Sequence, residues 1–210
     1  LGNTAGEGRF VSGVQPARQG DSFFFVRANS ERLRYTTAIA PADSATYVVK
    51  FKVATGASFW AGILDNSASY SSAAGLLLYA SSLNRLTIRI NGSATNFEFF
   101  DLRGFENTVV IVVDSISSET TLYSASGTKL VIGSVPTGLT SELTIGARKN
   151  STTTETDMLE GTVDYVQITK GTVSEAVAWA LTKNPYHLLE PATPTGYFTA
   201  SAAGVTSALT

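Results

Sequence analysis

Short runs in which apolar and polar residues alternate recur along most of the chain, and turn residues separate them. In the clearest run, residues 85–90, every second residue is apolar, as expected for a strand with one buried face. Asn91-Gly92 follows this run, and the dipeptide is typical of a two-residue β-hairpin turn. Residues 108–113 consist of one Thr and five consecutive apolar residues, which predicts a strand that is buried on both faces.

The whole pattern predicts about twelve short strands with turn signals between them. They are expected at 23–26, 32–36, 46–53, 58–64, 75–79, 85–90, 96–100, 108–113, 120–123, 129–132, 142–148 and 160–168. The spacing shows no alternation of strands with helices and no fixed repeat, which indicates a β-sandwich or jelly roll. We therefore predict an all-β fold, an antiparallel β-sandwich.

One helix is predicted near the C-terminal end, at residues 173–182. Thr172 and Glu175 stand at the spacing of a capping box, and Asn184-Pro185 ends the helix. Its apolar face combines Val173, Val177, Ala180 and Leu181 at helical spacing. We expect this face to pack against an end or edge of the sandwich.

The chain of 210 residues is long enough for one hydrophobic core and shows no sign of two. Residues 21–190 are assigned to the sandwich. Residues 1–20 and 191–210 lack periodicity, so we interpret them as an N-terminal and a C-terminal arm. Tyr197 and Phe198 are candidates for anchoring the C-terminal arm on a neighbouring subunit. That this arm folds back on its own domain is an equal alternative.

The low charge of the chain narrows its partners. The formal net charge is −2, and the basic residues are scattered. Because binding to phosphates requires a basic stripe, no nucleic-acid partner is expected. No apolar run reaches the roughly 18 residues of a membrane span, so no membrane partner is expected either. Ser and Thr make up roughly a quarter of the chain, which fits a β-protein with a polar, weakly charged surface.

The cysteine and histidine content excludes several kinds of site. The chain has no cysteine, which rules out thiol chemistry and cysteine-based zinc sites and favours a bacterial or phage source. The single histidine, His187, rules out a multi-histidine metal site. We expect His187 at the surface or at an interface.

Several motifs occur in an order that points to one fold family. They are the apolar run at 109–114, the Thr-Leu-Tyr at 121–123, the Leu-Thr-Ile-Gly-Ala at 143–147 and the Gly-Thr-Val-Asp-Tyr-Val at 161–166. Together they make residues 46–185 resemble the concanavalin A-like, or laminin G-like, jelly rolls. The resemblance implies a jelly-roll sandwich with a short C-terminal helix, here flanked by extended arms. It leaves the function open, because this fold serves lectins, glycanases, adhesins and structural modules.

A narrower resemblance concerns residues 184–191, Asn-Pro-Tyr-His-Leu-Leu-Glu-Pro. This stretch is similar to the ending of laminin G-like domains in structural proteins of tailed phages. With the missing cysteine, the low charge and the two arms, it favours a non-enzymatic structural protein of a tailed-phage virion. Such a protein would decorate the head or belong to the tail or baseplate. It would lie on the virion surface as a homo-oligomer, and its arms would contact other capsid or tail proteins.

An enzyme is not expected. Glycanases on this fold use a Glu-x-Asp-x-x-Glu strand that supplies a nucleophile and a proton donor. Here Glu160 and Asp164 have the wrong spacing, and Gln167 stands where a further carboxylate would be needed. Glu98 and Asp101 lack partners of the required type. We expect Asp164 to be a structural acceptor for backbone N–H groups of a loop.

The alternative function is that of a carbohydrate-binding module or an adhesin, with cell-surface glycans as partners and an extracellular location. The candidate glycan-binding residues surround the 65–74 loop. They are Trp60, Asn66, Tyr70 and Tyr79. Because Trp60 lies in an apolar run, a core position is expected for it more strongly than a sugar platform. Trp179, on the predicted helix, is expected to cover the sandwich.

No cofactor is expected, although calcium, the usual cofactor of lectins in this group, stays possible. Calcium requires several oxygen ligands from carboxylates and carbonyls. The acids predicted to lie in loops do not form a dense cluster, and isolated loop acids usually stabilise turns. The candidates are Asp65, Asn66, Asp101, Asp114 and Asp157.

Overall fold

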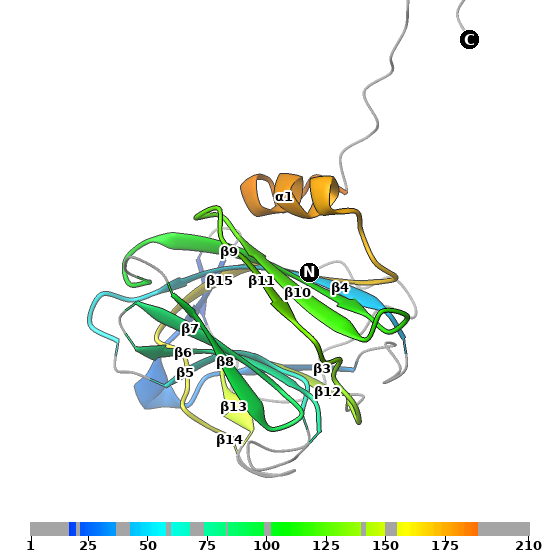
Figure 1. Cartoon of the computed structure of the whole chain (residues 1–210). Coiled ribbons are helices and arrows are strands. Elements are labelled where there is room, and N and C mark those ends of the chain that lie inside the picture. The colour runs from blue at the N-terminus through cyan, green and yellow to red at the C-terminus, as the bar shows by residue number, and fades with distance from the viewer. Residues whose placement is uncertain are drawn as a thin grey trace, which may run out of the picture.

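Two antiparallel sheets lie face to face, and one α-helix lies over the outer side of one sheet (Figure 1). The structure is a computed structural model that describes residues 17–19, 22–36, 43–57, 60–67, 74–82, 84–98, 102–139, 142–149 and 155–188. The predicted antiparallel β-sandwich with a short C-terminal helix is confirmed.

The larger sheet has seven strands in the order β1-β2-β15-β4-β9-β10-β11. These are β1 (Ala17–Gln19), β2 (Ser22–Phe25), β15 (Gly161–Lys170), β4 (Ala45–Val53), β9 (Glu106–Asp114), β10 (Glu119–Ser124) and β11 (Lys129–Ile132). Strand β9, which lies between β4 and β10, is buried on both faces, as its continuous apolar run predicts. Val109 and Ile111 point into the main core, whereas Val110 and Val112 belong to a second cluster beneath the helix.

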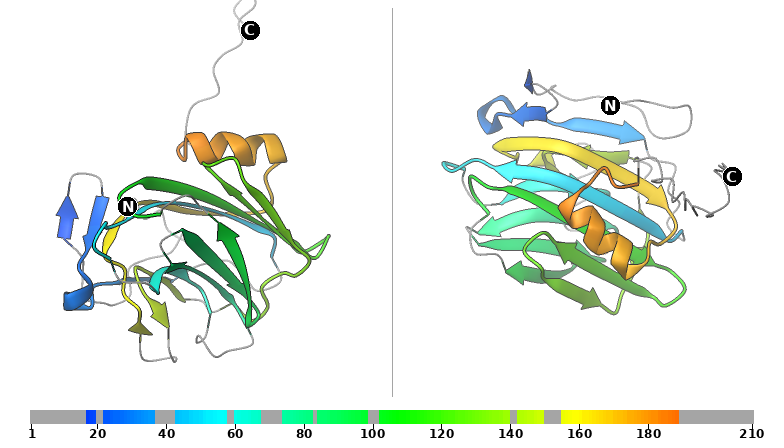
Figure 2. Two further views of the ribbon diagram at one scale, coloured as in Figure 1. Left: turned by 60° about the vertical axis from the view of Figure 1, so that its left-hand side comes forward. Right: turned by 90° about the horizontal axis from the view of Figure 1, so that it is seen from above.

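The second sheet has six strands in the order β3-β12-β5-β6-β7-β8. These are β3 (Leu33–Thr36), β12 (Glu142–Ile145), β5 (Ala61–Asp65), β6 (Leu76–Ser82), β7 (Arg85–Ile90) and β8 (Ser93–Glu98). A short 3-10 helix, η1 (Arg27–Asn29), precedes β3. The small pair β13 (Arg148–Lys149) and β14 (Glu155–Thr156) lies beyond the six-stranded sheet, on the side away from the helix (Figures 1 and 2).

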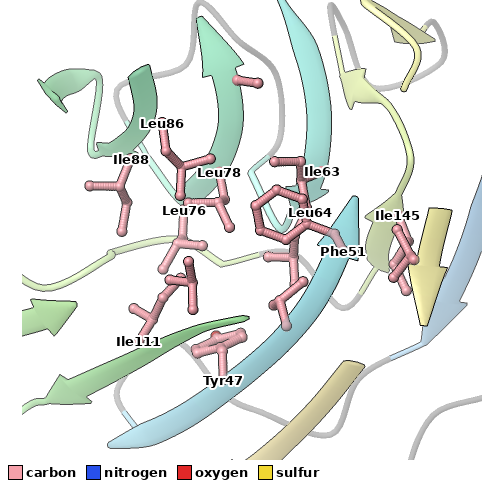
Figure 3. Packing of buried hydrophobic residues seen from close by; sticks show 14 of the residues in the cluster. Tyr47, Phe51, Ile63, Leu64, Leu76, Leu78, Leu86, Ile88, Ile111 and Ile145 are labelled. Carbon is pink, nitrogen blue, oxygen red and sulfur yellow. The ribbon is translucent and has the colours of Figure 1, made fainter. Parts of the chain in front are cut away.

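Side chains from the two inner faces meet in one hydrophobic core (Figure 3). Tyr47, Phe51 and Ile111 come from the seven-stranded sheet and face a layer of aliphatic side chains from the six-stranded sheet. That layer includes Ile63, Leu64, Leu76, Leu78, Leu86 and Ile88. Fully burying one such side chain stabilises the fold by about 1.5–3 kcal/mol, so this core is the main source of stability.

The β7–β8 hairpin turns at Asn91-Gly92, as predicted. Both residues have positive φ, 49° and 83°, the combination that a two-residue hairpin turn of the common primed type requires. The turn fixes the register of the hairpin, so that Thr87 lies opposite Asn96. This register positions part of the site described below.

The helix α1 (Glu175–Lys183) differs in two respects from the prediction. Its N-cap is Ser174, whose Oγ accepts the Val177 N–H at 3.4 Å, so the predicted capping box at Thr172 does not form. The helix packs on the outer face of β9 and β10 and not on an end or edge of the sandwich. Figure 2 shows it lying across these strands. The reason is that the outer face of β9 and β10 is apolar and needs a cover.

Some boundaries also differ. β5 begins at Ala61, so the predicted strand at 58–64 is shorter, and β8 precedes its predicted range by a few residues. The strand β1 lies within the range predicted as the N-terminal arm and pairs with β2. The other residues of that arm, and all of residues 191–210, lie outside the described part of the chain.

Candidate functional site

Two aromatic rings stack on the outer side of the six-stranded sheet. Trp60 immediately precedes β5 and is 46% exposed, and its indole stacks on the ring of Tyr79 in β6. The ring centroids are 5.6 Å apart and the planes differ by 16°. Tyr79 itself is only 3% exposed. Tyr79 therefore forms the base of the stack, and Trp60 presents an aromatic surface to solvent.

Strand alternation explains the position of Tyr79. Leu76, Leu78 and Ala80 point into the core, so Tyr79 points to the outer side of the sheet. We call the outer side of β5, β6, β7 and β8 the open face. The opposite outer side, formed by β4, β9 and β10 beneath α1, is called the helix-covered face.

The backbone at Trp60 holds the indole in this place. Trp60 has φ 66°, a left-handed conformation that is uncommon for a bulky residue and costs roughly 1–2 kcal/mol. The neighbouring Gly62 allows the chain to pass close beside it. A Cβ at Gly62 would lie 2.3 Å from the carbonyl carbon of Ala147, so any other residue would displace that segment. Strained backbone that persists in a folded protein often marks a functional position.

A chain of polar side chains crosses the open face next to the aromatic pair. Ser81 Oγ lies 2.6 Å from Thr87 Oγ1, and Thr87 donates its hydrogen to Asn96 Oδ1 at 2.9 Å. Because Thr87 donates to Asn96, its contact with Ser81 uses the Ser81 hydrogen. The Asn96 side chain is exposed, and no described group accepts a hydrogen bond from its Nδ2. The chain thus ends in an exposed N–H donor.

The strand register brings these groups into one row. Gly62 lies opposite Tyr79, Tyr79 opposite Thr87, and Thr87 opposite Asn96. Neighbouring strands are about 4.8 Å apart, so roughly 10 Å separates Tyr79 from Asn96 along the row. Tyr79 and Thr87 are buried and the Ala147 backbone lies against Gly62, so Asn96 is the exposed member of this row.

A buried carboxylate fixes the segment that borders this row. Asp65, at the end of β5, accepts hydrogen bonds from the backbone N–H and the hydroxyl of Ser67, and from the backbone N–H of Lys149. Burial raises the pKa of Asp65, and these hydrogen bonds oppose the increase. The Lys149 ammonium and the Asn66 amide both donate to the carbonyl oxygen of Glu142. This cluster ties β13 to β5 and β12.

The structure assigns different roles to the predicted glycan-binding residues. The expectation that Trp60 lies in the core is wrong, because the positive φ turns its side chain to the open face. Asn66 is wrong as a rim residue, since it is 1% exposed and serves the buried cluster. Tyr79 lies beside Trp60, where its buried ring supports the indole and presents no surface to a ligand. Tyr70 lies outside the described residues.

Three polar residues of the open face were missed, namely Ser81, Thr87 and Asn96. The polar half of the alternating run at 85–90, read together with the Asn91-Gly92 turn, contains the signal for Thr87 and Asn96. Ser81 has no such signal, because a β-bulge between Ala80 and Ser82 puts it on this face.

The acids considered for glycoside hydrolysis do not form a catalytic pair among the described residues. Asp164 lies at a β-bulge in β15, where its carboxylate is 3.6 Å from the Lys50 ammonium. Lys50 also binds Glu106 at 2.9 Å. The prediction that Asp164 accepts loop N–H groups is therefore replaced by an ion pair on the sheet. Glu160 precedes β15, the side chain of Glu98 is not described, and Asp101 lies outside the described residues.

The candidate calcium ligands that the structure describes have different structural roles. Asp65 is a buried strand residue and not a loop acid, and Asp114 stabilises an exposed turn by accepting from Ile116 N and Ser117 Oγ. The Ile116 N–H lowers the pKa of Asp114. Asp157 forms an ion pair with Arg148. Within the described ranges, which leave out Asp101, no three His, Cys, Asp or Glu side chains are grouped as metal ligands.

The remaining predictions concern the other side of the molecule. Trp179 covers the sandwich as expected, because its ring packs edge-on against Tyr123 with centroids 5.0 Å apart. His187 is exposed. Tyr197 and Phe198 lie outside the described residues. No helix in the described part of the chain is long and apolar enough to cross a bilayer.

Comparisons with known proteins agree with this architecture. No protein-family model and no curated protein sequence matches the chain. Among solved structures, the CBM40 module of the Ruminococcus gnavus IT-sialidase, bound to α2,3-sialyllactose, superposes with a TM-score of 0.55. The match has 14% identity and covers 67% of this chain and 82% of the module. The chain has the concanavalin A-like jelly-roll fold.

Two further structures extend this result. A heptameric pentraxin from Limulus polyphemus matches with a TM-score of 0.53 and 12% identity, over 86% of this chain and 84% of the pentraxin. The NanB sialidase of Streptococcus pneumoniae matches with a TM-score of 0.56 and 17% identity, over 90% of this chain and 30% of NanB. At such identities the likeness establishes the fold alone.

Proposed function

We propose that this chain is a non-catalytic carbohydrate-binding module, and that its open face binds the glycan. The observation that carries this proposal is the Trp60–Tyr79 stack. A tryptophan is held at a positive φ, exposed, and supported from below by a buried tyrosine. A core residue would not need this conformation, and the stacking on Tyr79, about 1 kcal/mol, at most offsets its cost.

The chemistry of the open face fits a sugar. A pyranose ring has an apolar face of C–H groups, which can lie on the indole of Trp60, and a rim of hydroxyl groups, which can bind the exposed amide of Asn96. Tyr79 fixes the indole before any ligand arrives. A preorganised platform loses little conformational entropy on binding, which increases affinity.

The comparisons support this choice over the virion role. One similar structure is a carbohydrate-binding module with a bound sialyllactose, whereas the similar structures named above include no virion protein. Sialyllactose therefore belongs among the first ligands to test.

The virion role remains a second proposal, and one observation favours it. Tyr186 and Leu188, which follow α1, are 42% and 39% exposed, and the Tyr186 ring packs on Tyr165 of the cluster beneath the helix. A protein held through that side, by contacts with other virion proteins, would direct its open face outward. The two proposals are compatible, and both place the protein on a virion surface or outside the cell.

A glycan array tests the proposed function, using the complete chain and two variants. Trp60→Ala removes the platform and is expected to weaken binding more than tenfold. Tyr186→Ala removes an aromatic side chain of similar exposure from the other side and should bind like the parent. Near-UV circular dichroism confirms that both variants fold. Loss of binding in both variants, or in neither, would contradict a site at Trp60, and no binding to any glycan would contradict the proposal itself.

A further inference from the structure

A second large aromatic side chain is exposed at the end of the sandwich where β4 is connected to β5. Phe105 directly precedes β9 and is 63% exposed. The register pairs Lys52 of β4 with Glu106 of β9, so Phe105 lies beside the end of β4. The connection that leaves β4 at this end leads directly to Trp60 and β5. Trp60 and Phe105 therefore lie at the same end of the molecule.

The loop that carries Phe105 is fixed by hydrogen bonds. Asn107, a buried residue of β9, donates from its Nδ2 to the carbonyl oxygens of Leu102 and Phe105, at 3.2 and 2.9 Å. Gly104 turns the chain with φ 76°, and its N–H donates to the Val53 carbonyl oxygen at 2.7 Å. An aromatic side chain on a loop held in this way loses little conformational entropy when it binds a ligand.

Two contacts join this loop to the segment that precedes Trp60. The Arg103 guanidinium donates to the Thr55 carbonyl oxygen at 3.2 Å. The Thr55 methyl group lies against Gly104, where an added Cβ would be 2.8 Å from Thr55 Cγ2. The loop that presents Phe105 and the segment that leads to Trp60 are thus held together.

The separation of the two aromatic residues exceeds one sugar ring. Trp60 precedes a strand of the six-stranded sheet and Phe105 precedes a strand of the seven-stranded sheet, and packed sheets lie about 10 Å apart. From Thr55, which contacts the Phe105 loop, the chain reaches Trp60 five residues later, over at most about 18 Å. One pyranose ring cannot contact both aromatic rings, whereas different sugars of one chain can.

We propose that Phe105 is a second aromatic platform of the glycan-binding site, so that the site crosses the end of the sandwich and binds an extended oligosaccharide. This inference rests on the proposed function and specifies its ligand as a chain of sugars instead of a single terminal sugar. Trp60 contacts one sugar, and the C–H face of a sugar further along the chain lies on Phe105.

The test measures how binding depends on the length of the glycan. The probes are ladders of increasing length, built from N-acetyllactosamine units with and without a terminal sialic acid, and from β1,4-linked glucose. In the parent chain, affinity should increase with length by about fivefold, the factor expected for one added aromatic contact. The increase should end once the glycan is long enough to reach Phe105.

Four variants locate the gain from length. Phe105→Ala should lose this gain and still bind the short members of a ladder like the parent, whereas Trp60→Ala should weaken short and long members alike. Phe105→Tyr keeps an aromatic ring and should retain the gain. Ile116→Ala removes an apolar side chain that is 93% exposed beyond the opposite end of β9, and it should retain the gain as well. Near-UV circular dichroism confirms that each variant folds.

The outcomes separate this inference from the proposed function. Affinity that does not depend on length, or a gain from length that Phe105→Ala leaves unchanged, would overturn the second platform, while binding that depends on Trp60 leaves the proposed function intact. An equal loss for short and long glycans in Phe105→Ala would also overturn it, because Phe105 would then act on the first sugar. If no glycan of any length binds, the proposed function fails and the second platform fails with it.

Discussion

The two outer faces of this sandwich each carry a tryptophan in contact with a tyrosine, and they use it in opposite ways. On the helix-covered face, Trp179 packs edge-on against Tyr123 and helps α1 to bury Val110 and Val112. On the open face, Trp60 lies flat on its tyrosine and keeps nearly half of its surface exposed. The first pair stabilises the fold, and the second covers one tyrosine while exposing a larger ring.

The backbone shows the same difference. Trp179 lies in a regular helix, which positions its side chain without strain. Trp60 occupies a left-handed conformation before β5, which costs free energy. An aromatic pair that only stabilises the fold does not need this cost, which is why we propose a structural role for one face and a binding role for the other.

The strongest test of this difference between the two faces removes each tryptophan in turn. Trp179→Ala should lower the free energy of unfolding by about 3 kcal/mol, because it removes a large ring packed on the sheet, and should leave glycan affinity unchanged. Trp60→Ala should cost only about 1 kcal/mol of stability, the energy of an aromatic pair, and should remove binding. Urea unfolding and a glycan-binding assay on both variants measure this. Equal losses of stability would break the comparison.

The buried carboxylate beneath the open face gives a pH-dependent prediction. In Asp65→Asn the new side-chain NH2 group would face the backbone N–H of Lys149, which is also a donor. The free energy of unfolding should therefore fall by about 2 kcal/mol. Burial raises the pKa of Asp65 above its ordinary 3.8. Its contribution to stability is therefore fully present below pH 3.8 and lost as the pH rises through the raised value.

The stability difference between the parent chain and Asp65→Asn should therefore be larger at pH 3 than at pH 7. Urea unfolding of both proteins at pH 3, 5 and 7 measures it. If the stability difference is instead smaller at pH 3 than at pH 7, the buried site favours the ionised carboxylate.

The strain at Trp60 predicts an unusual order of stability for two variants. Glycine normally destabilises a chain relative to alanine, but at φ 66° it avoids the clash of a Cβ. Trp60→Gly should therefore be more stable than Trp60→Ala by about 1 kcal/mol, while both lose glycan binding. Chemical unfolding of the two variants side by side gives this difference. If Trp60→Ala is the more stable, the conformation at this position is not strained.

The smallest expected effect concerns the start of the helix on the other face. Ser174→Ala removes the side chain that caps α1 and should cost about 0.5 kcal/mol, because the hydrogen bond is long. Thr172→Ala should have no effect on stability. Thermal unfolding monitored by circular dichroism resolves the two, and neither variant should alter glycan binding. A larger loss in Thr172→Ala would restore the capping box that the sequence pattern predicted.

The sequence pattern predicted most of the fold, because strand alternation and turn residues act locally. It located the β7–β8 hairpin through Asn91-Gly92 and the doubly buried β9 through its continuous apolar run. It placed Trp60 within the strand that follows, because a run of apolar residues does not reveal a positive φ. It also missed Ser81, which a bulge rotates outward, and it took Asn66 for a surface residue because its buried partner, the carbonyl oxygen of Glu142, is distant in the chain.

The most direct test of the central claim uses the fact that the chain has two tryptophans. In a Trp179→Phe variant the fluorescence comes from Trp60 alone, and its quenching by acrylamide can be measured with and without a glycan that the array shows to bind. If the open face is the binding site, the glycan should shield Trp60, reduce the quenching and shift the emission to shorter wavelength. Quenching of Trp60 that does not change when the glycan is bound would contradict the account.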